Sequence, residues 1–201
     1  MYVDKAVNIY TFEEIGLATI NDALFKLNND PKLWDALGDM YMVMSLFIVL
    51  IFAIKGLMQL IKEKSLKKVD KDILSFGILF GVLAVFWIIF DYLFIVNYRP
   101  IPVDGKLEGS YPSTHVLIVT YTLLSATTLI KPQPNVNKKA LKLFYITVYS
   151  CVLFLIIMTG LSRMLANMHW FTDVLAGALL GSALYFGSLK LNTILEVKKN
   201  D

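Results

Sequence analysis

FTDVLAGALLGSALYFGSLKL, residues 171–191, is the stretch of this sequence that most directly indicates the fold. A helix needs about 20 mostly apolar residues to cross a bilayer, and this stretch has that length. In lipid every backbone N–H and C=O must be paired within the segment, so the stretch predicts a membrane-spanning helix. Gly177 and Gly181 have the GxxxG spacing that lets two membrane helices approach closely. We therefore expect this span to pack tightly against a neighbour.

Four further apolar blocks precede this one, and short polar loops separate them; they cover residues 40–61, 73–96, 116–130 and 141–161. Hydrophobic residues make up 57% of the chain and charged residues 17%, whereas soluble domains usually carry about 25% charged residues. The block at 116–130 is short and rich in Thr and Ser, so we expect it to be buried among the other helices. The fold class predicted is an all-α integral membrane helical bundle with about five transmembrane helices.

The segment before the first span predicts an amphipathic helix over residues 11–28. Thr11 and Glu14 have the spacing of a capping box, and the apolar residues that follow are interleaved with acidic and amide side chains. We expect this helix to lie at the membrane interface; the alternative is a lid packed on the loops. The whole chain, 1–201, is predicted to be one domain, with parts at 1–38 (interfacial segment), 39–195 (transmembrane bundle) and 196–201 (cytoplasmic tail).

Lysine and arginine placement predicts the orientation, because cytoplasmic loops carry an excess of both. The loops after the first and third spans and the C-terminal tail are rich in lysine: Lys62, Lys64, Lys67, Lys68 and Lys71; Lys131, Lys138, Lys139 and Lys142; Lys198 and Lys199. The other two loops hold only Arg99 with Lys106, and Arg163. We expect a multi-pass protein of the cell membrane with a cytoplasmic C-terminus. The small size and a start unlike a cleavable signal peptide suggest a bacterial plasma membrane.

The two histidines of the chain, His115 and His169, fall on the predicted outer face together with Arg99 and Arg163. If a helix begins near His169, Asp173 lies one turn further along the same face. Its carboxylate could accept a proton from one imidazole nitrogen and leave the other free as a nucleophile. The helix N-terminus and the Arg163 guanidinium would both favour a bound anion.

A second helix start is predicted at Pro112 and Ser113, with Ser113 as the N-cap. The free N–H groups behind Ser113 would point at an anion, and His115 would project from the first turn. Two arginines, two helix N-termini and two histidines therefore predict a phosphate site that needs no metal or other cofactor. Cys151 is the single cysteine, so the chain has neither an intrachain disulfide nor a Cys-based metal site.

These residues resemble the type 2 phosphatidic acid phosphatase (PAP2) superfamily, which also includes vanadium haloperoxidases. Its three sequence blocks are Lys-x6-Arg-Pro, Pro-Ser-Gly-His and Ser-Arg-x5-His-x3-Asp. The third block matches completely from Ser162 to Asp173, and the second matches with Thr114 in place of Gly. The first matches at Arg99 and Pro100, with Tyr92 where the family has Lys. The resemblance covers about residues 92–173 and the layout of the spans.

The resemblance implies a role for each matching residue. His169 would attack phosphorus and form a phosphohistidine, and Asp173 would orient it. His115 would protonate the leaving oxygen and then activate water. The phosphoryl oxygens would be held as charge develops by Arg99, Arg163, Ser113 and Thr114. Tyr92 and Lys106 are candidate substrate contacts, because the family lysine is missing.

The function expected from the resemblance is a membrane lipid phosphatase that hydrolyses a phosphomonoester or diphosphate of a lipid. Candidate substrates are undecaprenyl diphosphate, phosphatidylglycerol phosphate, phosphatidic acid and lipid A phosphate. Two alternatives stay open: a lipid phosphotransferase with the same site, and a non-catalytic membrane protein that binds lipid phosphates, which the departure at Tyr92 favours. The expected partners are the lipid substrate and membrane lipids, with no nucleic acid.

Overall fold

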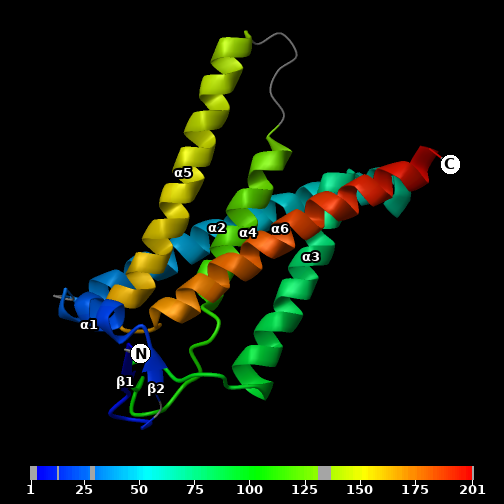
Figure 1. Cartoon of the computed structure of the whole chain (residues 1–201). Coiled ribbons are helices and arrows are strands. Elements are labelled where there is room, and N and C mark those ends of the chain that lie inside the picture. The colour runs from blue at the N-terminus through cyan, green and yellow to red at the C-terminus, as the bar shows by residue number, and fades with distance from the viewer. Residues whose placement is uncertain (1–3, 13, 28–29, 131–136, 201) are drawn as a thin grey trace.

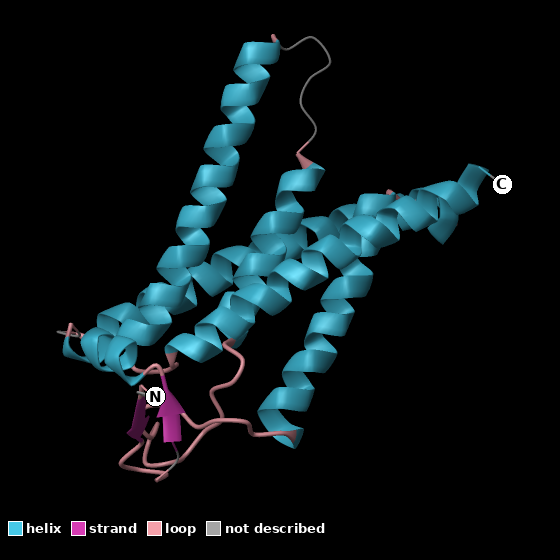
Figure 2. Cartoon of the chain, viewed as in Figure 1, coloured by secondary structure: helices cyan, strands magenta, loops and turns pink. Residues whose placement is uncertain are grey.

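The computed structural model describes residues 4–12, 14–27, 30–130 and 137–200. The chain folds into a small N-terminal hairpin and helix followed by five long helices, as Figure 1 and Figure 2 show. The hairpin and the first helix are β1 (Lys5–Val7), β2 (Glu14–Gly16) and α1 (Ala18–Lys26). The bundle helices are α2 (Pro31–Glu63), α3 (Lys71–Ile88), α4 (Thr114–Leu129), α5 (Lys138–Leu165) and α6 (Phe171–Asn200). Two short elements flank α3: η1 (Leu66–Lys68) and the π-helical turn η2 (Ile89–Leu93).

The five predicted apolar blocks are all helical, and the all-α membrane bundle is confirmed. The described residues contain four helices that are long and apolar enough to cross a membrane: Pro31–Glu63, Lys71–Leu93, Lys138–Leu165 and Phe171–Val197. The fifth, α4, is apolar but shorter. The second block was expected to reach residue 96, whereas helical structure ends at Leu93. Predicted basic residue Lys131 lies outside the described residues.

The short helix α4 occupies the centre of the bundle, as predicted from its Thr and Ser content. It contacts α2, α3, α5 and α6, and in Figure 1 it runs between α5 and α6. Most of its side chains are buried, including Thr120, Thr122 and Ser125. Because α4 is surrounded by protein, its small polar side chains allow close helix packing and do not face lipid.

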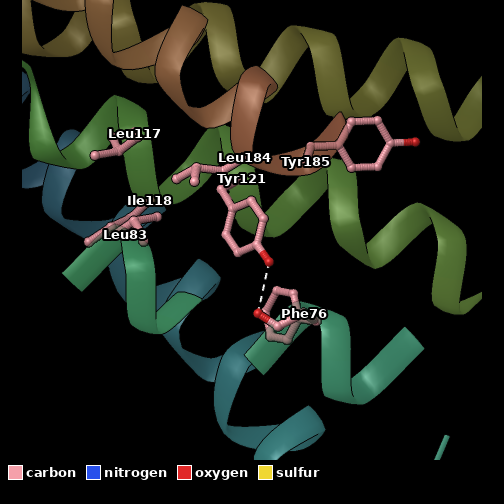
Figure 3. Packing of buried hydrophobic residues seen from close by; sticks show 7 residues of the cluster. All are labelled: Phe76, Leu83, Leu117, Ile118, Tyr121, Leu184 and Tyr185. Atoms are coloured by element: carbon pink, nitrogen blue, oxygen red, sulfur yellow. Dashed lines mark hydrogen bonds between the residues drawn. The ribbon is translucent and has the colours of Figure 1, made fainter. Parts of the chain in front are cut away.

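A buried cluster joins α4 to α3 and α6; its members are Phe76, Leu83, Leu117, Ile118, Tyr121, Leu184 and Tyr185 (Figure 3). The rings of Phe76 and Tyr121 stack with centroids 5.4 Å apart. The Tyr121 hydroxyl donates a hydrogen bond of 2.8 Å to the Phe76 carbonyl, drawn as a dashed line in Figure 3. This bond satisfies a phenol at the centre of an apolar cluster, where an unpaired hydroxyl would be costly.

The predicted close packing of the GxxxG pair is confirmed at the contact of α6 with α4. A Cβ added to Gly177 would lie 2.6 Å from the Ser113 carbonyl oxygen, and one added to Gly181 would lie 2.8 Å from the Thr120 Cβ. Only glycine allows the two backbones this approach. The Ser113 N–H then donates to the Asp173 carbonyl at 3.0 Å, which joins the first turns of the two helices.

The predicted start of the N-terminal helix at Thr11 is wrong, because a hairpin takes up this region and α1 begins at Ala18. Glu14 belongs to β2 and pairs with Lys5 across the hairpin, so it is not a capping-box residue. Asp4 supplies the cap instead, since its carboxylate accepts from the Thr19 N–H at 3.0 Å. The predicted end of this helix at residue 28 lies outside the described residues.

We expect Gly177→Ala to lower the midpoint of thermal unfolding of the detergent-solubilised protein. The new methyl group would collide with backbone, and such overpacking costs about 1–3 kcal/mol. Gly187→Ala is a matched control on the same helix, because its Cβ would meet Leu79 Cδ1 at an ordinary 3.6 Å. This control should unfold at the wild-type temperature or slightly above it. Equal midpoints for the two variants would contradict the importance of the α4–α6 contact.

Candidate active site

The site forms where the first turns of α4 and α6 meet the last turn of α5. α5 ends at Leu165, and Asn167 takes a positive φ of 58° that reverses the chain, as asparagine often does after a helix. The Met168 N–H donates to the Arg163 carbonyl at 3.1 Å. His169 therefore lies in a tight loop between two spans, directly before α6.

His169 is held by a backbone carbonyl. The side chain is buried, and its Nδ1 lies 2.8 Å from the Ser110 carbonyl oxygen. Because a carbonyl can only accept, Nδ1 carries the proton in the neutral ring. The Nε2 lone pair is then available for attack on an electrophile, which is the tautomer that a nucleophilic histidine needs.

Asp173 shares a face with His169, but the expected hydrogen bond between them is absent from the described residues. The Asp173 Oδ2 lies 3.9 Å from Nδ1 of His169, too far for a hydrogen bond. This oxygen instead accepts from the Trp170 N–H at 2.9 Å. The N–H just before α6 therefore occupies one carboxylate oxygen, and the atom that lies within hydrogen-bond distance of His169 Nδ1 is the Ser110 carbonyl oxygen.

The pKa of His169 lies well below its ordinary value of 6.5. Burial is the main cause, because it disfavours the charged ring. The nearby positive charges of Arg163 and Arg99 lower the pKa further, and the Ser110 carbonyl opposes them. Burial and the neighbouring arginines therefore favour the neutral imidazole.

Both predicted arginines lie close enough to His169 to lower its pKa. Arg163 has 3% of its side chain exposed, and its Nη1 donates to the Asp35 carboxylate at 2.7 Å. Arg99 pairs with Glu108 at 3.0 Å. Within the described part of the chain, the buried Nε of each arginine has no hydrogen-bond partner. Each guanidinium thus keeps a donor for an incoming anion.

Sequence reasoning missed two carboxylates on α2. Asp39 Oδ1 lies 2.9 Å from His115 Nε2 and 3.6 Å from Arg163 Nη1, while Asp35 pairs with Arg163. The first span was expected to begin at residue 40, which left Asp35 in the interfacial segment and Asp39 at the very start of the bundle. Their four-residue spacing, which places them on one helix face, was the signal available in the sequence.

Ser113 is the residue before α4, as predicted, but it does not cap the helix through its side chain. Its Oγ is buried and has no hydrogen-bond partner among the described residues. Thr114 follows at the first helical position and is half-buried. An unpaired hydroxyl at the first turn of a helix is suited to meet an anion there.

A cavity of about 410 Å³ extends from the two histidines into the helix bundle. Its polar end contains Arg99, Thr114, His115 and His169. The wall beyond is mostly apolar and comes from α2, α3, η2 and α4: Met42, Leu46, Phe80, Leu83, Ala84, Trp87, Phe90, Leu117 and Ile118. The cavity therefore combines an anion-binding end with a slot for an apolar chain.

The two candidate substrate contacts, Tyr92 and Lys106, do not line this cavity. Tyr92 has 70% of its side chain exposed on η2, and its neighbour Asp91 lines the cavity instead. Lys106 is exposed on the turn closed by the Val103–Lys106 bridge. In the described residues, no group of three or more His, Cys, Asp and Glu side chains is placed to hold a metal ion.

The N-terminal segment packs against the residues that flank the site. Asn21 on α1 accepts from the Phe171 N–H at 3.0 Å, so it caps the helix that follows His169. Asn8 donates to the Arg99 carbonyl at 3.3 Å. These contacts agree with the lid alternative for this segment, because α1 packs on the loops that carry the site.

Comparisons with known proteins identify a family and two solved structures of similar fold. A family model described as the PAP2 superfamily matches residues 91–193, while the comparison with curated proteins found no match. A transmembrane PAP2 type phosphatidylglycerolphosphate phosphatase from Bacillus subtilis has a similar fold, with a TM-score of 0.63 and 20% identity over 88% of this chain and 86% of that one. LpxE from Aquifex aeolicus has a TM-score of 0.50 and 18% identity over 86% and 94%.

We expect His169 to remain neutral at pH 6.5, where an ordinary histidine is half protonated. The measurement is an NMR titration of the protein with labelled histidine in detergent. The chain has two histidines, so a His115→Asn variant assigns the signals. A midpoint at or above pH 6.5 for His169 would contradict the described burial.

Proposed function

This chain belongs to the PAP2 superfamily, and from that premise we propose that it is a membrane phosphatase that hydrolyses a phosphomonoester or diphosphate of a lipid. The observation that carries the proposal is the cavity, which has both histidines and Arg99 at one end and an apolar wall beyond. Such a cavity suits a molecule with a phosphate headgroup and a hydrocarbon chain. The proposed substrates are phosphatidylglycerol phosphate, undecaprenyl diphosphate, phosphatidic acid and lipid A phosphate.

In the first proposed step, the Nε2 lone pair of His169 attacks phosphorus. The bond from phosphorus to the lipid oxygen breaks, and its electron pair goes to that oxygen. His115 donates a proton to the oxygen, so that the lipid leaves as an alcohol or a monophosphate. The phosphoryl group is then held as a phosphohistidine, while Nδ1 of His169 keeps its hydrogen bond to the Ser110 carbonyl.

In the second step, neutral His115 takes a proton from water as the water oxygen attacks phosphorus. The P–N bond breaks, its electron pair returns to Nε2 of His169, and phosphate is released. His115 is again protonated, so one proton cycles through it. The buried Asp173 carboxylate, 3.9 Å from the His169 ring, stabilises the positive charge that develops on that ring.

The phosphoryl oxygens are proposed to meet donors that have no partner among the described residues. These are the Nε groups of Arg99 and Arg163 and the Ser113 hydroxyl. The N-termini of α4 and α6 add aligned N–H groups. Preorganised donors of this kind stabilise charge in a phosphoryl-transfer transition state, and they do so without a metal ion.

We place the site on the extracytoplasmic face, with the C-terminus in the cytoplasm of a bacterial cell. The support is the charge distribution: Lys67 and Lys68 lie in η1 at the turn between α2 and α3, whereas the loops that carry the site are poor in lysine. Lysine-rich loops stay on the cytoplasmic side.

Purified protein in detergent should release phosphate from at least one of the proposed lipids, and His169→Ala should lower the rate by about 10³-fold or more, because no other nucleophile replaces it. Inorganic phosphate is measured over time for each lipid. Lys67→Ala is the control, since this residue is exposed in η1. Phosphate passed to another lipid instead of water would favour a phosphotransferase, and no turnover by well-folded protein would favour a lipid-phosphate-binding protein.

EDTA should leave the rate of phosphate release unchanged, because arginine and N–H donors are proposed to supply all the charge stabilisation. The assay uses substrate in a nonionic detergent, so that chelation does not alter how the lipid is presented. A rate that falls with EDTA and returns with Mg²⁺ would contradict this part of the proposal.

A further inference from the structure

Asp39 reaches His115 from a different helix. Its Oδ1 lies 2.9 Å from Nε2 of His115, which stands in the first turn of α4. His115 is half-buried and lines the same cavity as His169. The two residues are 76 positions apart in the chain, so the contact depends on the packing of α2 against α4.

We propose that Asp39 is a positioning residue that holds His115 by its Nε2 and so prepares it as the acid and base of the reaction. The inference rests on the proposed function, in which His115 exchanges protons with the leaving oxygen and with water. A carboxylate on one imidazole nitrogen fixes the tautomer and the ring orientation, and it stabilises the protonated ring.

The hydrogen bond between Asp39 and Nε2 of His115 determines which nitrogen of His115 exchanges protons in the reaction. A carboxylate accepts, so Nε2 keeps its hydrogen in both protonation states. Nδ1 is then the nitrogen that gives a proton to the leaving oxygen, as the bond from that oxygen to phosphorus breaks. In the second step Nδ1 takes a proton back from water. Asp39 gains and loses no proton in this cycle, so the number of protons exchanged with the substrate and with water is unchanged.

The charges around His115 explain why a carboxylate is needed. Burial, and after it Arg163 on α5, oppose positive charge on the ring, while Asp39 and Asp35 on α2 favour it. The cavity also contains Asp91 from η2, Arg99 and His169. Because Arg163 is proposed to bind phosphate and must stay charged, Asp39 offsets its effect on His115.

The approach of α2 to the site requires a glycine. A Cβ added to Gly38 would lie 2.8 Å from Cδ and 2.9 Å from Nη1 of Arg163. Asp35, one turn before Asp39, pairs with Arg163 at 2.7 Å, and Asp39 lies further from that guanidinium at 3.6 Å. The two carboxylates therefore have different partners: Asp35 forms an ion pair with Arg163, and Asp39 lies within hydrogen-bond distance of His115.

The test compares a lipid phosphate with 4-nitrophenyl phosphate. The measured quantity is kcat/KM, which covers the steps up to departure of the leaving group. An alkoxide or phosphate leaving group needs a proton from the acid, whereas nitrophenolate leaves without one. Asp39→Asn should therefore lower kcat/KM for the lipid by about 10²-fold and for the nitrophenyl ester by less than about threefold.

Asp35→Asn is the matched control, because it changes the partner of Arg163 and leaves the His115 contact in place. It should change kcat/KM of both substrates by the same factor, and Asp39→Glu should recover part of the lipid rate. Equal losses on the two substrates with Asp39→Asn, or no loss on either, would overturn the inference. A wild-type protein without turnover would refute the proposed function itself.

A second measurement does not depend on turnover. Nitrogen-15 NMR of labelled histidine in the wild-type protein should find His115 with its proton on Nε2 in the neutral ring, and Asp39→Ala should shift this tautomer equilibrium. A His115 ring that carries its proton on Nδ1 in the wild type would overturn the inference whatever the kinetics.

Discussion

The backbone contact between α4 and α6 is the constraint on which the rest of the structure depends. Two glycines one turn apart remove the side chains that would separate the helices, and the amide of Ser113 can then donate to the carbonyl of Asp173. Both helices begin at this contact, so their N-termini face one region of space. The two histidines, which are far apart in the chain, line one cavity for this reason.

The features that the sequence predicts well are those encoded locally. Hydropathy over about 20 residues identifies a spanning helix, and the five apolar blocks are all helical in the structure. Glycine spacing identifies the tightly packed face of α6, and the Thr and Ser content of residues 116–130 identifies α4 as the central helix. The histidines and arginines were predicted from residue types and from spacings within short motifs, and His115, His169 and Arg99 line one cavity in the structure.

The features that the sequence does not predict depend on contacts between distant residues or on backbone atoms. The acceptor for His169 Nδ1 is the carbonyl of Ser110, 59 positions away, and a carbonyl has no side-chain signature. Asp35 lies 128 positions from the arginine it pairs with. Near the N-terminus, Glu14 has the spacing from Thr11 that is typical of a capping box. In the structure it belongs to a hairpin strand and forms an ion pair with Lys5.

The hydrogen bond from the Phe171 amide to Asn21 has a consequence for how the domain can be divided. The family model covers residues 91–193, yet the acceptor that completes the first turn of α6 comes from α1. The helix that carries Asp173 therefore receives its cap from a segment that lies outside the residues matched by the family model. In a chimaera that exchanged the N-terminal segment for that of a relative, an acceptor at the position of Asn21 would have to be supplied again.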